Sequence, residues 1–103
     1  MKIKRSDNVN GTCYQGTIRT TYEDLFSAFG KPDIGPVFYD MDDKVTCEWC
    51  LDIDGVICTI YDWRTGSGTP TKHYDWHIGG FSIDSVDKVR AAFTEKHKTY
   101  LEF

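Results

Sequence analysis

Residues 45–63 read VTCEWCLDIDGVICTIYDW, and this stretch decides the fold. It holds two alternating runs joined by Asp54-Gly55. An Asp-Gly pair between such runs is a strong signal for a two-residue hairpin, because both central turn residues take positive φ and these two tolerate it best. The turn sets a register that predicts four cross-strand pairs on the core face: Ile53 with Val56, Leu51 with Cys58, Trp49 with Ile60, and Cys47 with Asp62.

The other face of this hairpin is mixed in character. It is expected to pair an acid with an apolar residue, a thiol with a hydroxyl, an acid with an aromatic ring, and a hydroxyl with an aromatic ring. The four pairs are Asp52 with Ile57, Cys50 with Thr59, Glu48 with Tyr61, and Thr46 with Trp63. This face is therefore predicted to lie away from the core.

Two amphipathic helices are predicted on either side of the hairpin. The first spans residues 20–29, with Thr21 as its cap and Gly30 and Pro32 ending it. Its apolar stripe is Tyr22, Leu25, Phe26 and Phe29. The second helix follows Ser82 as its cap and runs toward the C-terminus. Its predicted buried stripe is Ile83, Val86, Val89 and Phe93.

A third strand is predicted over residues 72–78. Its apolar side chains Tyr74, Trp76 and Ile78 alternate with polar ones, and Gly79-Gly80 ends the run. Shorter strands are expected at Ile3 and over residues 14–19. The sequence therefore predicts one α+β domain over residues 1–103, with an antiparallel sheet of three to five strands and two helices packed on one face.

The charge and hydropathy of the chain limit its partners. Twelve Lys and Arg against sixteen Asp and Glu leave a net charge of −4, which disfavours direct binding to nucleic acid or anionic membranes. No window approaches the roughly 20 apolar residues that span a bilayer, and the first residues lack the apolar stretch of a signal peptide. We therefore expect a cytoplasmic protein. Its four cysteines are expected to be reduced and mostly buried.

The residues do not favour a catalytic function. No nucleophile elbow and no phosphate-binding glycine loop occurs, so we expect no catalytic residue and no cofactor. His73, Asp75 and His77 share a predicted strand face and are the candidate metal ligands, but their spacing of about 7 Å favours an exposed polar face. Asp62 is expected to bond Arg64, Arg19 or a backbone amide, and a role as general acid or base is the alternative.

The candidate binding surface lies on the face of the sheet away from the core. Large aromatic side chains ringed by charge are the composition of a binding hot spot. The N-terminal segment or a second copy of the chain, forming a homodimer, could instead cover this face. The predicted surface consists of Glu48, Ile57, Tyr61, Trp63, Asp75 and His77.

Five segments carry a resemblance to a known group of proteins. They are residues 21–32 (TYEDLFSAFGKP), 44–49 (KVTCEW), Asp54-Gly55, 59–63 (TIYDW) and 74–80 (YDWHIGG). In this order they resemble small proteins of tailed bacteriophages, over residues 8–93. The resemblance brings no established activity. It implies a context in which short accessory proteins bind and disable a host component.

The function that we expect from the sequence is therefore inhibition by binding. The chain is predicted to be a phage accessory protein that binds a host protein or protein complex, with a bacterial defence system as one target, in the manner of an anti-CRISPR protein. A sponge that holds a nucleotide-like small molecule between subunits is the alternative. A metal-dependent hydrolase is the third reading.

Overall fold

The computed structural model describes the backbone of residues 1–38, 44–63 and 65–101, and the side chains of these ranges up to residue 96. Its strands are β1 (Ile3–Arg5), β2 (Cys13–Thr20), β3 (Glu48–Ile53), β4 (Val56–Tyr61) and β5 (Tyr74–Gly80), and its helices are α1 (Tyr22–Phe29) and α2 (Asp84–Leu101). The strands form one antiparallel sheet in the order β1-β3-β4-β5-β2. The predicted α+β class and sheet are confirmed.

The hairpin at Asp54-Gly55 has the predicted register. Ile53 lies opposite Val56, and Trp49 opposite Ile60. Asp54 has a φ of 53° and Gly55 a φ of 87°, the positive values that a two-residue turn requires. The sheet then continues from β4 to β5 as the predicted meander, while β2 and β1 add the two edges.

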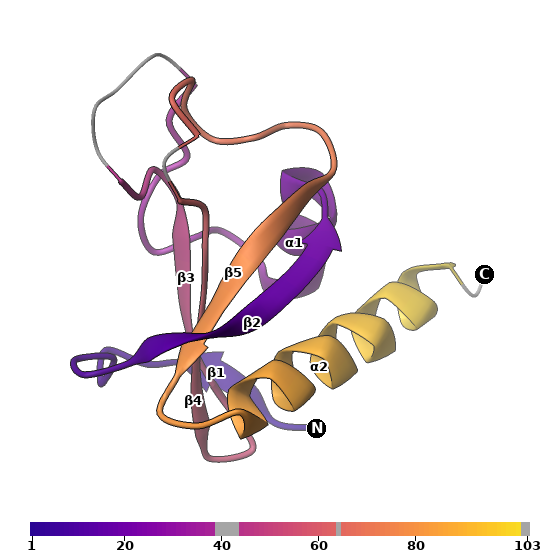
Figure 1. Ribbon diagram of the computed structural model, residues 1–103. Coiled ribbons are helices and arrows are strands. Elements are labelled where there is room, and N and C mark those ends of the chain that lie inside the picture. The colour runs from indigo at the N-terminus through magenta and orange to yellow at the C-terminus, as the bar shows by residue number, and fades with distance from the viewer. Residues whose placement is uncertain (39–43, 64, 102–103) are drawn as a thin grey trace.

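The core lies between the sheet and the two helices, which both lie on one side of it (Figure 1). Trp49 and Trp76 are fully buried at its centre, edge to face with ring centroids 5.7 Å apart. The Trp49 indole N–H donates to the Gly30 carbonyl at 2.8 Å and so ties the end of α1 to β3. No helix in the described part of the chain combines the length and the apolar character needed to cross a membrane.

The predictions for Phe26, Ile83 and His73 are wrong, and Gly79-Gly80 belong to β5 instead of ending the strand before it reaches them. Phe26 is 45% exposed, since the short helix α1 buries only Leu25 and Phe29. Ile83 is 60% exposed because α2 begins one residue later, and Ala92 is buried farther along that helix. His73 precedes β5 and is exposed, so it does not share a strand face with the residues of β5.

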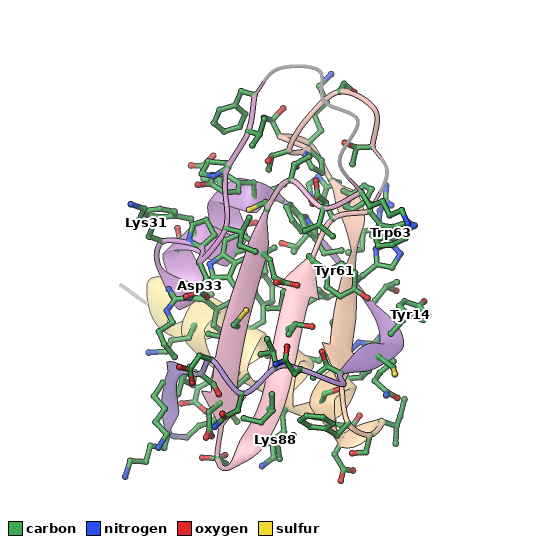
Figure 2. The ribbon with its side chains drawn as sticks, turned by 90° about the vertical axis from the view of Figure 1, so that its left-hand side faces the viewer. Tyr14, Lys31, Asp33, Tyr61, Trp63 and Lys88 are labelled. Atoms are coloured by element: carbon green, nitrogen blue, oxygen red, sulfur yellow. The ribbon has the colours of Figure 1, made fainter. Side chains whose placement is uncertain are left out.

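A connecting segment crosses the face of the sheet opposite the helices. Because β1 and β2 occupy the two edges, residues 6–12 must pass over the sheet, and Figure 2 shows them running across the strands on the side turned toward the viewer. The segment leaves β1 opposite Leu51 and enters β2 opposite Gly80. Cys50 and Thr59 point to this face and are buried, with 8% and 2% of their surface exposed. We call residues 6–12 the crossing segment.

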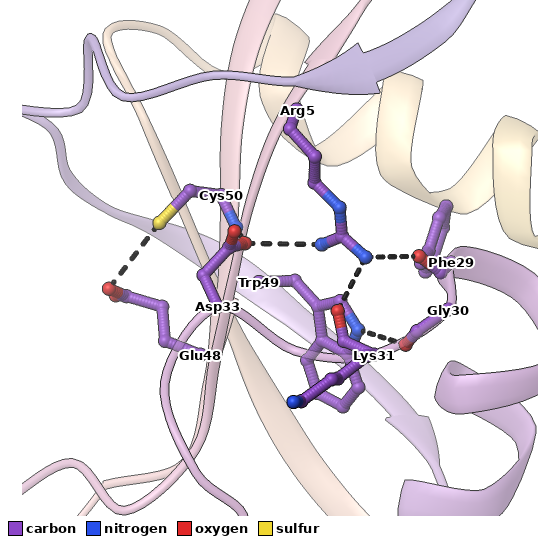
Figure 3. A network of polar contacts seen from close by, with 8 residues as sticks. All are labelled: Arg5, Phe29, Gly30, Lys31, Asp33, Glu48, Trp49 and Cys50. Carbon is purple, nitrogen blue, oxygen red and sulfur yellow. Dashed lines mark hydrogen bonds and ion pairs between the residues drawn. The ribbon is translucent and has the colours of Figure 1, made fainter.

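Arg5 joins the short edge strand β1 to the end of α1 (Figure 3). Its guanidinium donates to the carbonyl oxygens of Phe29, at 2.7 Å, and Lys31, and forms an ion pair with Asp33 at 3.1 Å. Asp33 in turn accepts the Cys50 backbone N–H at 2.7 Å. One planar donor group therefore links β1, the end of α1 and β3.

Replacing Arg5 by lysine should destabilise the fold. A lysine ammonium keeps the charge but cannot present the fixed fork of donors that reaches two carbonyls and a carboxylate together. We expect a loss of about 1 kcal/mol in the free energy of unfolding, measured by urea denaturation. Lys4→Arg, at the neighbouring exposed position of β1, is the matched control and should leave stability unchanged. Equal stability of Arg5→Lys and the parent would contradict this role.

Candidate functional site

Four aromatic side chains line a hollow of about 250 Å³ on the sheet face opposite the helices. Three of them come from β2, β4 and β5, and Trp63 lies two residues after the end of β4. Figure 2 shows three of them, with Tyr61 between Trp63 and Tyr14 on the face turned toward the viewer. We call Tyr14, Tyr61, Trp63 and His77 the aromatic hollow.

Tyr61 and His77 form one wall of the aromatic hollow. They are opposite each other on β4 and β5, and their rings stack at 21° with centroids 5.4 Å apart. Gly79 leaves room beside them, because a Cβ there would collide with the Thr59 hydroxyl and come within 3.3 Å of the Tyr61 ring. The absence of a side chain at this position therefore lets the rings lean over the sheet.

Tyr14 reaches the aromatic hollow through an irregularity in β2. The register shifts between Tyr14 and Gly16, so that Tyr14 lies opposite Gly79 and Thr17 lies opposite His77. Without this bulge, strict alternation would place Tyr14 on the core face with Ile18. The bulge turns the Tyr14 ring toward His77 instead, with centroids 5.2 Å apart and planes inclined at 59°.

Trp63 closes the aromatic hollow at the end of β4. Its ring is inclined at 74° to that of Tyr61, with centroids 6.5 Å apart. The Tyr74 hydroxyl fixes its backbone by accepting the Trp63 N–H at 3.1 Å and donating to the Trp63 carbonyl at 3.2 Å. The Lys44 ammonium lies 5.8 Å from the centroid of the Trp63 ring, a cation–π contact.

The structure brings together part of the surface predicted from the sequence. Tyr61, Trp63 and His77 line the aromatic hollow, and Glu48 is the cross-strand neighbour of Tyr61 on β3. Ile57 is separated from them, because it lies two rows away from Tyr61 along β4. The crossing segment thus passes over the middle of this face and leaves the aromatic hollow open. Cover by the N-terminal segment was one of the alternatives considered for this face.

Asp75 lies beside the aromatic hollow without lining it. It points to the same face as His77 but forms an exposed ion pair with Arg19 at 3.3 Å. The sequence did not predict Tyr14 as part of this surface, because strict alternation along the strand places its side chain on the same face as Gly16 and Ile18. Gly16 within the strand pattern was the available signal for a bulge.

The candidate metal ligands are not gathered into a site. Among the described residues, no group of three His, Cys, Asp or Glu side chains is placed so that it could hold a metal ion. His73 lies outside β5, Asp75 pairs with Arg19, and the His77 ring stacks on Tyr61. This part of the chain therefore offers no support for the metal-dependent reading.

Asp62 is fully buried and satisfied by hydrogen bonds. Its carboxylate accepts the backbone N–H groups of Thr46, at 2.8 Å, and Cys47, at 3.0 Å, and also the Thr46 hydroxyl. The Thr46 hydroxyl further contacts that of Thr69 at 2.9 Å. The expected backbone amides are therefore its partners, and Asp62 joins the loops at the open end of the hairpin.

Burial disfavours the charged forms of three thiols, Tyr61 and His77. Burial raises the pKa values of the Cys47, Cys50 and Cys58 thiols to about 12, so these thiols stay protonated at neutral pH. Burial and the charge of Glu48 raise the pKa of Tyr61. Burial lowers the pKa of His77, against the opposing effect of Asp62 and Asp75. None of these five groups is an activated nucleophile.

Comparisons of the chain with protein-family models, with curated proteins and with solved structures found no match. The function of the aromatic hollow is therefore inferred from its own geometry and chemistry.

Replacing Asp62 by asparagine should test whether this carboxylate is structural. The amide keeps the shape but turns one acceptor oxygen into a donor that faces another donor, so we expect a loss of about 1–3 kcal/mol in the free energy of unfolding. Asp75→Asn is the matched control, since it removes an exposed charge and should change stability little. If Asp62→Asn keeps the parent's stability but loses binding to a partner, Asp62 acts in binding directly.

The lowered pKa of His77 predicts a pH dependence of stability. Its pKa in the folded state lies below the ordinary value of 6.5, so the unfolded chain binds the proton more tightly. The contribution of His77 is complete above pH 6.5 and is lost as the pH falls through that value. Thermal melting between pH 7.5 and 5 should therefore show a smaller loss of stability in His77→Gln than in the parent.

The exposed His73 supplies the control for this measurement. His73→Gln should keep the parent's pH dependence. Glu48 has the opposite effect on the pH dependence of stability, because burial raises the pKa of its carboxyl and acidification therefore favours the folded state at that group. The effect of His77 is therefore read from the difference between variants and not from the parent's profile alone. An unchanged pH profile in His77→Gln would contradict the assignment.

Proposed function

We propose that this chain is a non-enzymatic accessory protein of tailed bacteriophages that binds a bacterial host protein and inhibits it. The observation that supports binding is the aromatic hollow, formed by three rings from neighbouring strands and by Trp63, which follows β4. Tyrosine and tryptophan are enriched among the residues that dominate protein interfaces. The phage context and the inhibition of a host factor, with a defence system as the target class, rest on the resemblance described above.

Binding is favoured over catalysis by the chemistry of the site. Burial raises the pKa of the Cys50 thiol, which points to the same face of the sheet, the His77 pKa is lowered, and the buried Asp62 is used in hydrogen bonds. Large rings that present contact area and carry no activated group are suited to recognition. The net charge of −4 further favours a protein over a nucleic acid as the partner.

A nucleotide-like ligand held between two copies of the chain is the second candidate. The rings could stack on a base, but about 250 Å³ is below the range of roughly 300–1,000 Å³ that is typical of small-molecule sites. The carboxylate of Glu48, on the strand position opposite Tyr61, would also repel phosphate groups. A macromolecular partner therefore remains the stronger proposal.

The proposal predicts that a host protein is captured through Trp63. The tagged chain is used to capture proteins from bacterial lysate, the captured protein is purified, and its affinity is measured by calorimetry. Trp63→Ala should weaken binding by about thirtyfold or more, the effect of removing a central interface residue. Trp63 is 40% exposed and lies outside the core, so the variant is expected to fold.

Phe81→Ala is the matched control, because Phe81 is also exposed but does not line the aromatic hollow. This variant should bind as the parent does. A dimer that captures no host protein would contradict the proposal. A nucleotide retained on the purified chain and detected by mass spectrometry would favour the second candidate.

A further inference from the structure

The aromatic hollow has the composition of a site for a cation. All four lining side chains are rings, and their planes are mutually inclined, with Tyr14 and Trp63 tilted against the stacked pair of Tyr61 and His77. The face of an aromatic ring carries partial negative charge and attracts cations, and rings set at angles to one another can surround one.

Acidic groups surround these rings. The charge of Glu48 acts on Tyr61, and the charges of Asp62 and Asp75 act on His77. Asp75 is paired with Arg19, and Asp62 is enclosed by its own hydrogen bonds. Within the described residues, Glu48 has no ion pair with a basic side chain, and its carboxylate accepts only the Cys50 thiol at 3.6 Å. The field at the hollow therefore favours positive charge.

One ring of the hollow already attracts a cation in this structure. The Lys44 ammonium lies 5.8 Å from the centroid of the Trp63 ring. Lys44 does not line the aromatic hollow, so this contact leaves the cavity itself open. The contact shows that the position of Trp63 suits a cation–π interaction.

We infer that the aromatic hollow takes the guanidinium group of an arginine side chain from the partner protein. This inference rests on the proposed function, since it names the chemistry of the partner. A guanidinium is planar, weakly hydrated and able to stack on rings, and its fork of donors can also pair with a carboxylate, for which Glu48, opposite Tyr61 on β3, is the candidate. A quaternary ammonium would use the rings alone and leave Glu48 unpaired.

Short peptides test the inference without the partner. Acetyl-Gly-Arg-Gly-amide and acetyl-Gly-citrulline-Gly-amide are titrated into the labelled chain, followed by NMR of the indole and backbone N–H groups. Citrulline keeps the shape of arginine but has no charge. The arginine peptide should shift the Trp63 indole signal and should bind about fivefold to thirtyfold more tightly than the citrulline peptide. Trp49 and Trp76 are fully buried, and their indole signals should respond less.

Variants assign the binding to the rings. Tyr61→Leu keeps an apolar side chain but removes the ring, and should lower the affinity for the arginine peptide by about fivefold or more. Tyr61→Phe keeps the ring and should lower the affinity less than Tyr61→Leu does. Trp63→Leu is the second test, because Trp63 lies outside the core, and Phe81→Leu is the control. Melting temperatures establish that each variant is folded.

Three outcomes would overturn the inference: equal affinity for the arginine and citrulline peptides, unchanged binding of the arginine peptide to Tyr61→Leu and Trp63→Leu, or binding of tetramethylammonium in preference to the arginine peptide. If a host protein is captured through Trp63 but arginine is not preferred, the inference fails and the proposed function stands. If arginine is preferred but no host protein is captured, the ligand chemistry is supported and the proposed function fails.

Discussion

The two-residue turn at Asp54-Gly55 is the constraint on which the rest of the structure depends. It fixes which side chains of β3 and β4 face the helices, because a slip of one residue would turn each of them to the other side of the sheet. The turn is also tied to its surroundings: the Asp54 carboxylate accepts the Lys2 backbone N–H at 2.8 Å and pairs with Lys88 of α2 at 3.3 Å. The same register buries Trp49 and places Tyr61 on the open face.

The sheet order imposes a second constraint, on the face that the helices leave uncovered. With β1 and β2 at opposite edges, the crossing segment must pass over the strands between them. Cys50 and Thr59 are buried on this face, and Ile57 lies two rows along β4 from Tyr61 of the aromatic hollow. The aromatic hollow gathers its rings at the end of the face near Tyr61 and Trp63. The topology therefore limits where a partner can reach this cluster.

The chemistry of the site follows from this arrangement. Burial raises the pKa values of the Cys50 thiol in β3 and the Cys58 thiol in β4 and lowers the pKa of His77, so none of these groups is an activated nucleophile. Asp62, the buried carboxylate, is used to hold the loop at Thr46 against the hairpin. A rigid set of rings with acids at its edge loses little conformational freedom when a ligand binds, which suits recognition.

The local pattern of the chain determined the hairpin, its register and the two helices. Those features depend on neighbours in sequence: Asp54-Gly55 specifies its own turn, and Thr21 caps α1 through the N–H of Asp24 three residues later. Tertiary structure decided the rest. The inclusion of Tyr14 depends on a bulge in β2 relative to β5, and the burial of Cys50 and Thr59 is found on the face that a segment crosses. Both result from contacts between residues far apart in the chain, which alternation within a single strand does not encode.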